Sequence, residues 1–155
     1  MCITFGLLRE RWHVLALHRA RHDYPELKGH ALANAHRWKP EVVLIEAAGT
    51  GTALCREMQL DRSLGQCRVM AITPREPKPV RLEAQTDALS RGLILLPADA
   101  PWLTDLRHEL LGFPNAKHDD QVDALVQFVA WATGQKAQSA LETAKYGRRQ
   151  NMTRR

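Results

Sequence analysis

Three aspartates lie within a stretch of five residues, at Asp119, Asp120 and Asp123. We expect a helix over residues 119–132, because apolar residues recur there at helical spacing. Asp119 suits the N-cap, while Asp120 and Asp123 are three apart and project from one helix face. Two carboxylates held close together repel unless a cation neutralises them, so the pattern predicts a Mg²⁺ or Mn²⁺ site. The adjacent His118 is a candidate proton carrier or further ligand.

A fourth acid, Glu46, directly follows the apolar run Val42–Ile45. Such a run predicts a strand covered on both faces, and ligands of open α/β sheets collect outside the carboxyl ends of strands. A solvated glutamate at a strand end is the alternative interpretation. If Glu46 and the helix acids converge, they form a site for two divalent ions, the arrangement that cleaves phosphodiester bonds.

The elements that must position these acids are a pair of strands at the start of the chain, and after it strands that alternate with helices. Residues 2–8 and 12–18 predict two strands of an antiparallel hairpin around Arg9–Arg11. Further strands are expected at 42–45, 69–72 and 93–96, and helices at 25–37, 53–60, 79–90 and 119–132. Another helix starts at Pro101, with Leu103, Leu106, Leu110 and Leu111 facing inward. This order predicts an α/β fold, a mixed sheet flanked by helices.

Composition favours one ordinary domain with a basic tail. The chain has 155 residues, 45% hydrophobic and 25% charged, which is typical of a globular domain. We divide it into a domain at 1–135 and a tail at 136–155, whose last thirteen residues lack acids and include Arg148 and Arg149. The tail is a candidate DNA-binding arm, or simply a solvated terminus. Three cysteines without paired spacing fit the bacterial cytoplasm, and no apolar run is long enough for a membrane span.

Two other patterns are interpreted as structural features and not as binding sites. His18 and His22 are four apart, but they lie in an expected strand-to-loop region, so no shared metal is predicted. Gly49 and Gly51 fit either a phosphate-binding helix start or a tight strand-to-helix turn, and we favour the turn.

The chain resembles the C-terminal nuclease domain of the large terminase subunit of tailed bacteriophages and prophages. The resemblance spans nearly the whole chain, and its most specific part is the string Phe113–Ala124, which contains the three aspartates. The other matching segments are Asp23–Leu27, Val43–Gly51, Lys78–Arg81, Leu95–Pro97 and Ala100–Trp102.

This resemblance implies a ribonuclease H-like fold and Mg²⁺- or Mn²⁺-dependent cutting of double-stranded DNA during genome packaging. By match, Glu46 is the acid of the second catalytic motif, and Asp120 and Asp123 are those of the third, with Asp119 adjacent. Expected partners are the terminase small subunit, the portal and an ATPase domain. The residues expected near DNA are Lys78, Arg81, Lys117, Arg148 and Arg149.

The chain departs from the family pattern at its start. The first catalytic motif of the family is an aspartate on a central strand before the hairpin, whereas the first aspartate here is Asp23, after it. We therefore expect the fold to lack its first central strand and the chain to be a fragment. Exposed strand edges pair readily with other chains, so we expect self-association or an altered sheet arrangement.

Three functions remain open from the sequence. The first is a terminase endonuclease domain, whose activity as a fragment depends on the missing aspartate. The second is a nuclease that resembles Holliday-junction resolvases, which share the fold and the helix acids. The third is a non-catalytic prophage remnant that binds DNA.

Overall fold

The computed structural model describes residues 1–74, 76–115 and 119–135. Its first elements form the expected antiparallel hairpin, β1 (Cys2–Leu8) and β2 (Arg11–His18). Arg9 and Glu10 turn the chain with positive φ angles of 49° and 64°, the backbone geometry of a tight two-residue hairpin. The short strand β5 (Ile94–Leu95) pairs parallel to β2, so this three-stranded sheet is mixed.

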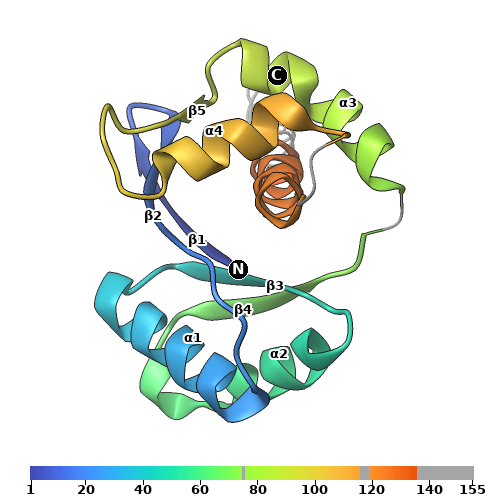
Figure 1. Cartoon of the computed structure of the whole chain (residues 1–155). Coiled ribbons are helices and arrows are strands. Elements are labelled where there is room, and N and C mark those ends of the chain that lie inside the picture. The colour runs from blue at the N-terminus through green and yellow to red at the C-terminus, as the bar shows by residue number, and fades with distance from the viewer. Residues whose placement is uncertain (75, 116–118, 136–155) are drawn as a thin grey trace, which may run out of the picture.

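A second, two-stranded parallel sheet holds β3 (Val42–Glu46) beside β4 (Arg68–Ile72). The helices α1 (Tyr24–Trp38) and α2 (Thr50–Leu60) lie together on one side of this sheet, with the 3-10 turn η1 (Arg62–Leu64) after α2 (Figure 1). Ala35, Leu54 and Met58 are the buried centre of this half, and Val43 and Ile45 of β3 pack against them.

A second core joins the two sheets. It is built on a helix at residues 120–135, where Phe128, Val129 and Ala132 are buried. Phe5 of β1, Trp12 of β2 and Leu44 of β3 pack against that cluster. Because Val43 and Ile45 face one core while Leu44 faces the other, β3 is covered on both faces, as predicted.

The remaining helices are α3 (Lys78–Ser90) and α4 (Leu103–Gly112), which lie around the helix at 120–135 (Figure 1). The expected α/β fold, a mixed sheet flanked by helices, is confirmed. The strands form two separate sheets in the described part of the chain, in the orders β1–β2–β5 and β3–β4. β1 and β3 are therefore edge strands, and self-association through them stays a prediction.

The structure corrects the expected inward face of α4. Leu103 and Leu106 are buried as predicted, but the prediction for Leu111 is wrong, because that side chain is 87% exposed. Glu109 is buried instead, at 5% exposure. None of the helices in the described part is long and apolar enough to cross a membrane.

Candidate functional site

Glu46 is the last residue of β3, at the carboxyl end of the strand. The chain turns sharply after it: Gly49 has a φ of +53°, and a Cβ at Gly51 would collide with the carbonyl oxygen of Glu46. The two glycines therefore serve the tight strand-to-helix turn that their spacing predicted. The backbone N–H of Ala47 donates to the Ile72 carbonyl at 2.8 Å, which fixes the end of β3 against β4.

The Glu46 side chain contacts the helix that carries the aspartates. Its Oε2 accepts a hydrogen bond of 2.6 Å from Nε2 of Gln127. Gln127 and Asp123 are four residues apart, so they occupy the same face of the helix at 120–135. The strand-end acid and the helix acid thus lie on one surface, although 77 positions separate them in the sequence (123 minus 46).

Asp123 is the most enclosed of the three aspartates, with a side chain 13% exposed. Its Oδ1 lies 2.6 Å from Nη2 of Arg81, and its Oδ2 lies 3.6 Å from Nζ of Lys78. Lys78 also donates a hydrogen bond of 2.9 Å to Oδ2 of Asp119. Two cations at the start of α3 thus neutralise Asp119 and Asp123 together.

Asp120 points to a different cation. Its Oδ2 lies 3.9 Å from Nη2 of Arg19, which follows β2, and its side chain is 64% exposed. Spacing on the helix favoured Asp120 and Asp123 as the pair, whereas shared contacts with Lys78 group Asp123 with Asp119.

A buried carboxylate anchors the start of this helix. Oε1 of Glu109 accepts hydrogen bonds from the backbone N–H of Gln121 at 2.5 Å and of Val122 at 3.3 Å. Oε2 accepts a third from Nε2 of Gln121 at 2.8 Å. A helix start leaves N–H groups without intrahelical partners, so Glu109 acts as a cap supplied by α4. It thereby fixes the turn that carries Asp120 and Asp123.

The acids of the site are already paired with basic side chains. The hydrogen bond to Asp119, together with the charges of Asp123 and Asp120, raises the pKa of Lys78 above its ordinary value despite some desolvation. Lys78 therefore stays charged throughout the neutral range.

Asp123 and Arg81 meet as an ion pair without hydrogen-bond alignment. Asp123 Oδ1 and Arg81 Nε and Nη1 are buried and have no hydrogen-bond partner among the described residues. A hard divalent cation prefers this kind of carboxylate oxygen, so the donor set fits Mg²⁺ or Mn²⁺. The acids that the structure describes do not, however, bring three carboxylates within 4.8 Å of one another, so such an ion would have to draw them together.

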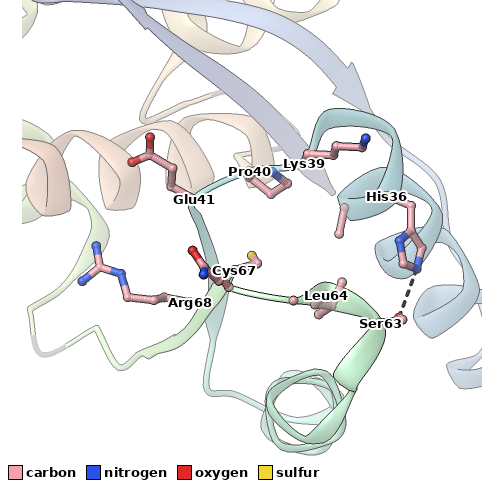
Figure 2. Close-up of a pocket in the computed structure, with 11 residues that line it drawn as sticks. His36, Lys39, Pro40, Glu41, Ser63, Leu64, Cys67 and Arg68 are labelled. Carbon is pink, nitrogen blue, oxygen red and sulfur yellow. Dashed lines mark hydrogen bonds between the residues drawn. The ribbon is translucent and has the colours of Figure 1, made fainter.

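An open pocket among the described residues lies away from the acids. It has a volume of about 490 Å³ and is lined by residues that include His36, Lys39, Glu41, Ser63 and Arg68 (Figure 2). Glu41 and Arg68 lie where β3 and β4 begin, whereas Glu46 lies where β3 ends. The pocket is therefore at the opposite end of the sheet from the acids and is not the candidate site.

Four predicted site residues, Lys117, His118, Arg148 and Arg149, lie outside the described residues. Conversely, sequence reasoning missed Gln127 and Glu109. Gln127 had a usable signal, its spacing of four from Asp123. Glu109 was a lone acid inside the apolar pattern of α4, a place where an uncompensated charge is disfavoured.

Comparison with known proteins adds one finding. A family described as a terminase RNaseH-like domain matches residues 2–130. No curated protein and no solved structure matches the chain.

Proposed function

Because the chain belongs to the terminase ribonuclease H-like domain family, we propose that it is a metal-dependent DNA endonuclease domain. Its substrate would be double-stranded DNA, cut during phage genome packaging in the cytoplasm of a bacterial host. The terminase small subunit, the portal and an ATPase domain would be its partners, in line with the family.

One observation carries the proposal: the hydrogen bond between Glu46 and Gln127. It brings the acid at the end of β3 onto the helix face that presents Asp123. Carboxylates from a strand end and a helix face can then share a divalent ion, which neither could hold well alone.

Glu46, Asp123 and Asp119 would hold Mg²⁺ or Mn²⁺, with Asp120 as an outer carboxylate. Such ions, when bound, lower the pKa of water and stabilise the leaving oxygen of a phosphodiester. Gln127 holds the Glu46 carboxylate in place, and Glu109 holds the first turn of the helix. Lys78 and Arg81 now neutralise the acids and would turn to DNA phosphates when a divalent ion replaces them.

The role of Lys78 gives a first test, in DNA binding with Ca²⁺ in place of Mg²⁺ or Mn²⁺, so that a divalent ion can replace Lys78 at the acids. We expect Lys78→Ala to reduce the slope of log affinity against log salt concentration by about 1, the effect of one lost phosphate contact. Its ion pairs are partly exposed and contribute at most about 1 kcal/mol, so the fold should survive. Fluorescence anisotropy with a labelled duplex in Ca²⁺, repeated over a salt series, measures this slope.

Lys28→Ala is the matched control, because Lys28 forms a similar ion pair of 2.6 Å with Glu57 but lies between α1 and α2, away from the acids. An unchanged slope in Lys78→Ala, or an equal loss in the control, would remove Lys78 from the DNA-binding surface.

The proposed activity is tested with supercoiled plasmid, linear duplex and a four-way junction, each with Mg²⁺, Mn²⁺, Ca²⁺ or EDTA. We expect nicking and linearisation of plasmid with Mn²⁺ and none with EDTA. Preferential resolution of the junction would favour the resolvase-like alternative. Duplex binding without cleavage in any metal would contradict the endonuclease proposal and support the non-catalytic remnant.

A further inference from the structure

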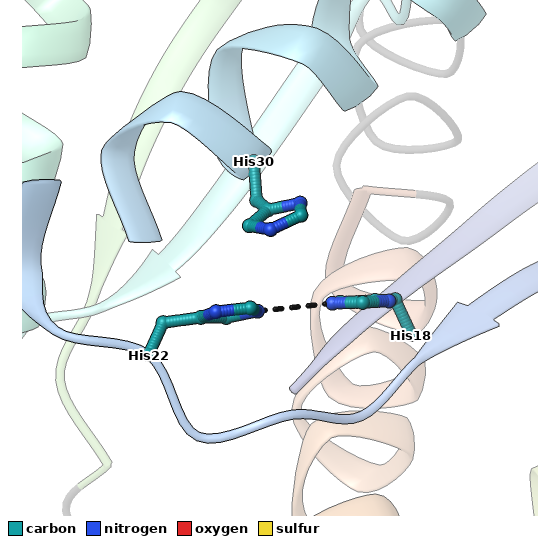
Figure 3. A group of neighbouring side chains, drawn as sticks. All are labelled: His18, His22 and His30. Atoms are coloured by element: carbon teal, nitrogen blue, oxygen red, sulfur yellow. Dashed lines mark hydrogen bonds between the residues drawn. The ribbon is translucent and has the colours of Figure 1, made fainter. Parts of the chain in front are cut away.

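Three histidines from separate elements meet on the side of the molecule where β2 leads into α1. His18 ends β2, His22 lies in the connection that follows, and His30 lies in α1 (Figure 3). One ring nitrogen from each lies within 4.8 Å of those of the other two. Among the described residues, no other combination of three or more histidine, cysteine or acidic side chains meets this distance.

The separation of the His18 and His22 ring nitrogens is close to the separation of two ligands on one metal ion. Nε2 of His18 lies 3.1 Å from Nε2 of His22. Two nitrogens bound to one tetrahedral Zn²⁺ at about 2.0–2.1 Å would lie about 3.3–3.4 Å apart, which is close to this separation. The two rings now meet end to end, with centroids 5.4 Å apart and planes inclined by 10°, so both must turn for their lone pairs to converge on one ion. The His30 ring lies over His22 with centroids 4.2 Å apart and planes inclined by 30°. One nitrogen of His30 already lies within 4.8 Å of those of His18 and His22, so the His30 side chain would have to rotate to supply the third ligand.

The Glu26 carboxylate orients the ring of His22. Oε2 of Glu26 lies 3.3 Å from Nδ1 of His22, so a proton on Nδ1 donates to Glu26 and leaves the Nε2 lone pair facing His18. Metal-bound histidines generally have such a partner for the second ring nitrogen, which orients the ring and raises its basicity.

We propose that His18, His22 and His30 bind a transition-metal ion of the Zn²⁺ class, with Glu26 as the carboxylate behind His22. Imidazole ligands suit Zn²⁺, Cu²⁺, Co²⁺ and Ni²⁺, whereas Mg²⁺ prefers the oxygens of the acidic site. Three histidines with an open fourth position form an established type of zinc site.

The surroundings of His18 also favour its neutral ring, the form that metal binding requires. Desolvation, and next the proximity of His30 and His22, lower the pKa of His18 below its ordinary value. The ring of His18 is therefore uncharged at neutral pH.

Such an ion would join the two halves of the fold. β2 belongs to the β1–β2–β5 sheet, whereas α1 packs against the β3–β4 sheet. An ion bound at both would stabilise the native state only, so the Tm should rise by roughly 5–10 °C at a free Zn²⁺ concentration 100 times Kd. This role is separate from the acidic site and does not depend on nuclease activity.

The test is a Zn²⁺ titration of the purified chain against a chromophoric chelator, in excess Mg²⁺ to occupy the acidic site. We expect one Zn²⁺ per chain, and a Co²⁺ complex with the intense visible absorption of tetrahedral coordination. His18→Gln and His30→Gln should each weaken binding by more than about 100-fold, and Glu26→Gln by about 10-fold. His108→Gln, which alters an exposed histidine of α4, should bind like the wild type.

The Tm of each variant without Zn²⁺ shows whether it is folded. Zn²⁺ binding that persists unchanged in both His18→Gln and His30→Gln would overturn the proposal and place the ion on other ligands. No stoichiometric binding to the wild type would overturn it equally, leaving three histidines that only stack.

Discussion

We expect Asp123→Asn to lower the rate of the proposed Mn²⁺-dependent plasmid cleavage by at least about 100-fold. Loss of an outer-shell partner of a metal ligand costs 10–100-fold, and Asp123 is proposed as a ligand itself. It is the most enclosed acid of the site, with a side chain 13% exposed and its Oδ1 2.6 Å from Nη2 of Arg81. Asparagine keeps the size of the side chain but removes its charge, so a divalent ion loses its principal attraction. Initial rates of loss of supercoiled plasmid measure the effect.

Asp87→Asn is the control for Asp123→Asn, since Asp87 pairs with Arg91 on the exposed surface of α3, with a side chain 73% exposed. It should cleave at the wild-type rate. Duplex binding in EDTA should be no weaker in Asp123→Asn, because a negative charge is removed from the DNA-facing surface. Cleavage at more than half the wild-type rate by a folded Asp123→Asn protein would exclude Asp123 from the catalytic site.

We expect Glu109→Ala to destabilise the fold by about 3 kcal/mol. The Glu109 carboxylate accepts three hydrogen bonds from Gln121 and Val122, and its side chain is only 4% exposed. Its loss leaves buried N–H groups unsatisfied, each of which costs about 1–3 kcal/mol. At about 2–4 °C for each kcal/mol in a domain of this size, the Tm should fall by roughly 6–12 °C. Urea denaturation gives the free energy of unfolding directly.

Two control variants test whether the loss of stability comes from the capping role of Glu109. Glu83→Ala removes an exposed glutamate of α3 and should change the free energy of unfolding by less than about 0.5 kcal/mol. Glu109→Gln keeps one acceptor oxygen and should lose less than Glu109→Ala. If Glu109→Ala unfolds at the wild-type urea concentration, the carboxylate does not hold the start of the helix.

Local sequence patterns predicted most elements of the fold, because they report which residues are apolar and at what spacing. The hairpin, α1 and β3 occur where they were expected. Patterns failed where burial depends on a distant partner. Leu111 was predicted to be a core residue and is exposed. Glu109, which the pattern did not single out, is buried, because its partners are N–H groups of another helix. Spacing also could not show that the strands divide into two sheets.

The candidate site was also predictable in part, because local patterns show where an acid lies within its own strand or helix. Glu46 and Asp123 were identified from their positions at a strand end and on a helix face, and the structure places them on one surface. Spacing favoured Asp120 over Asp119 as the partner of Asp123, although residues three and four apart are both neighbours on a helix. The contacts of Lys78 from α3 group Asp123 with Asp119 instead. The histidine cluster was missed because the third member, His30, comes from another element.

The central claim is that Glu46 and Asp123 hold one divalent ion between them, and Mn²⁺ binding tests it most directly. The electron paramagnetic resonance signal of free Mn²⁺ is followed during titration of the chain, in a His30→Gln background that disables the histidine cluster. We predict that Glu46→Gln and Asp123→Asn each weaken Mn²⁺ binding by at least about 10-fold, and that the double variant is little weaker than either. Binding that Glu46→Gln leaves unchanged would contradict the account, because the two acids would then not share an ion.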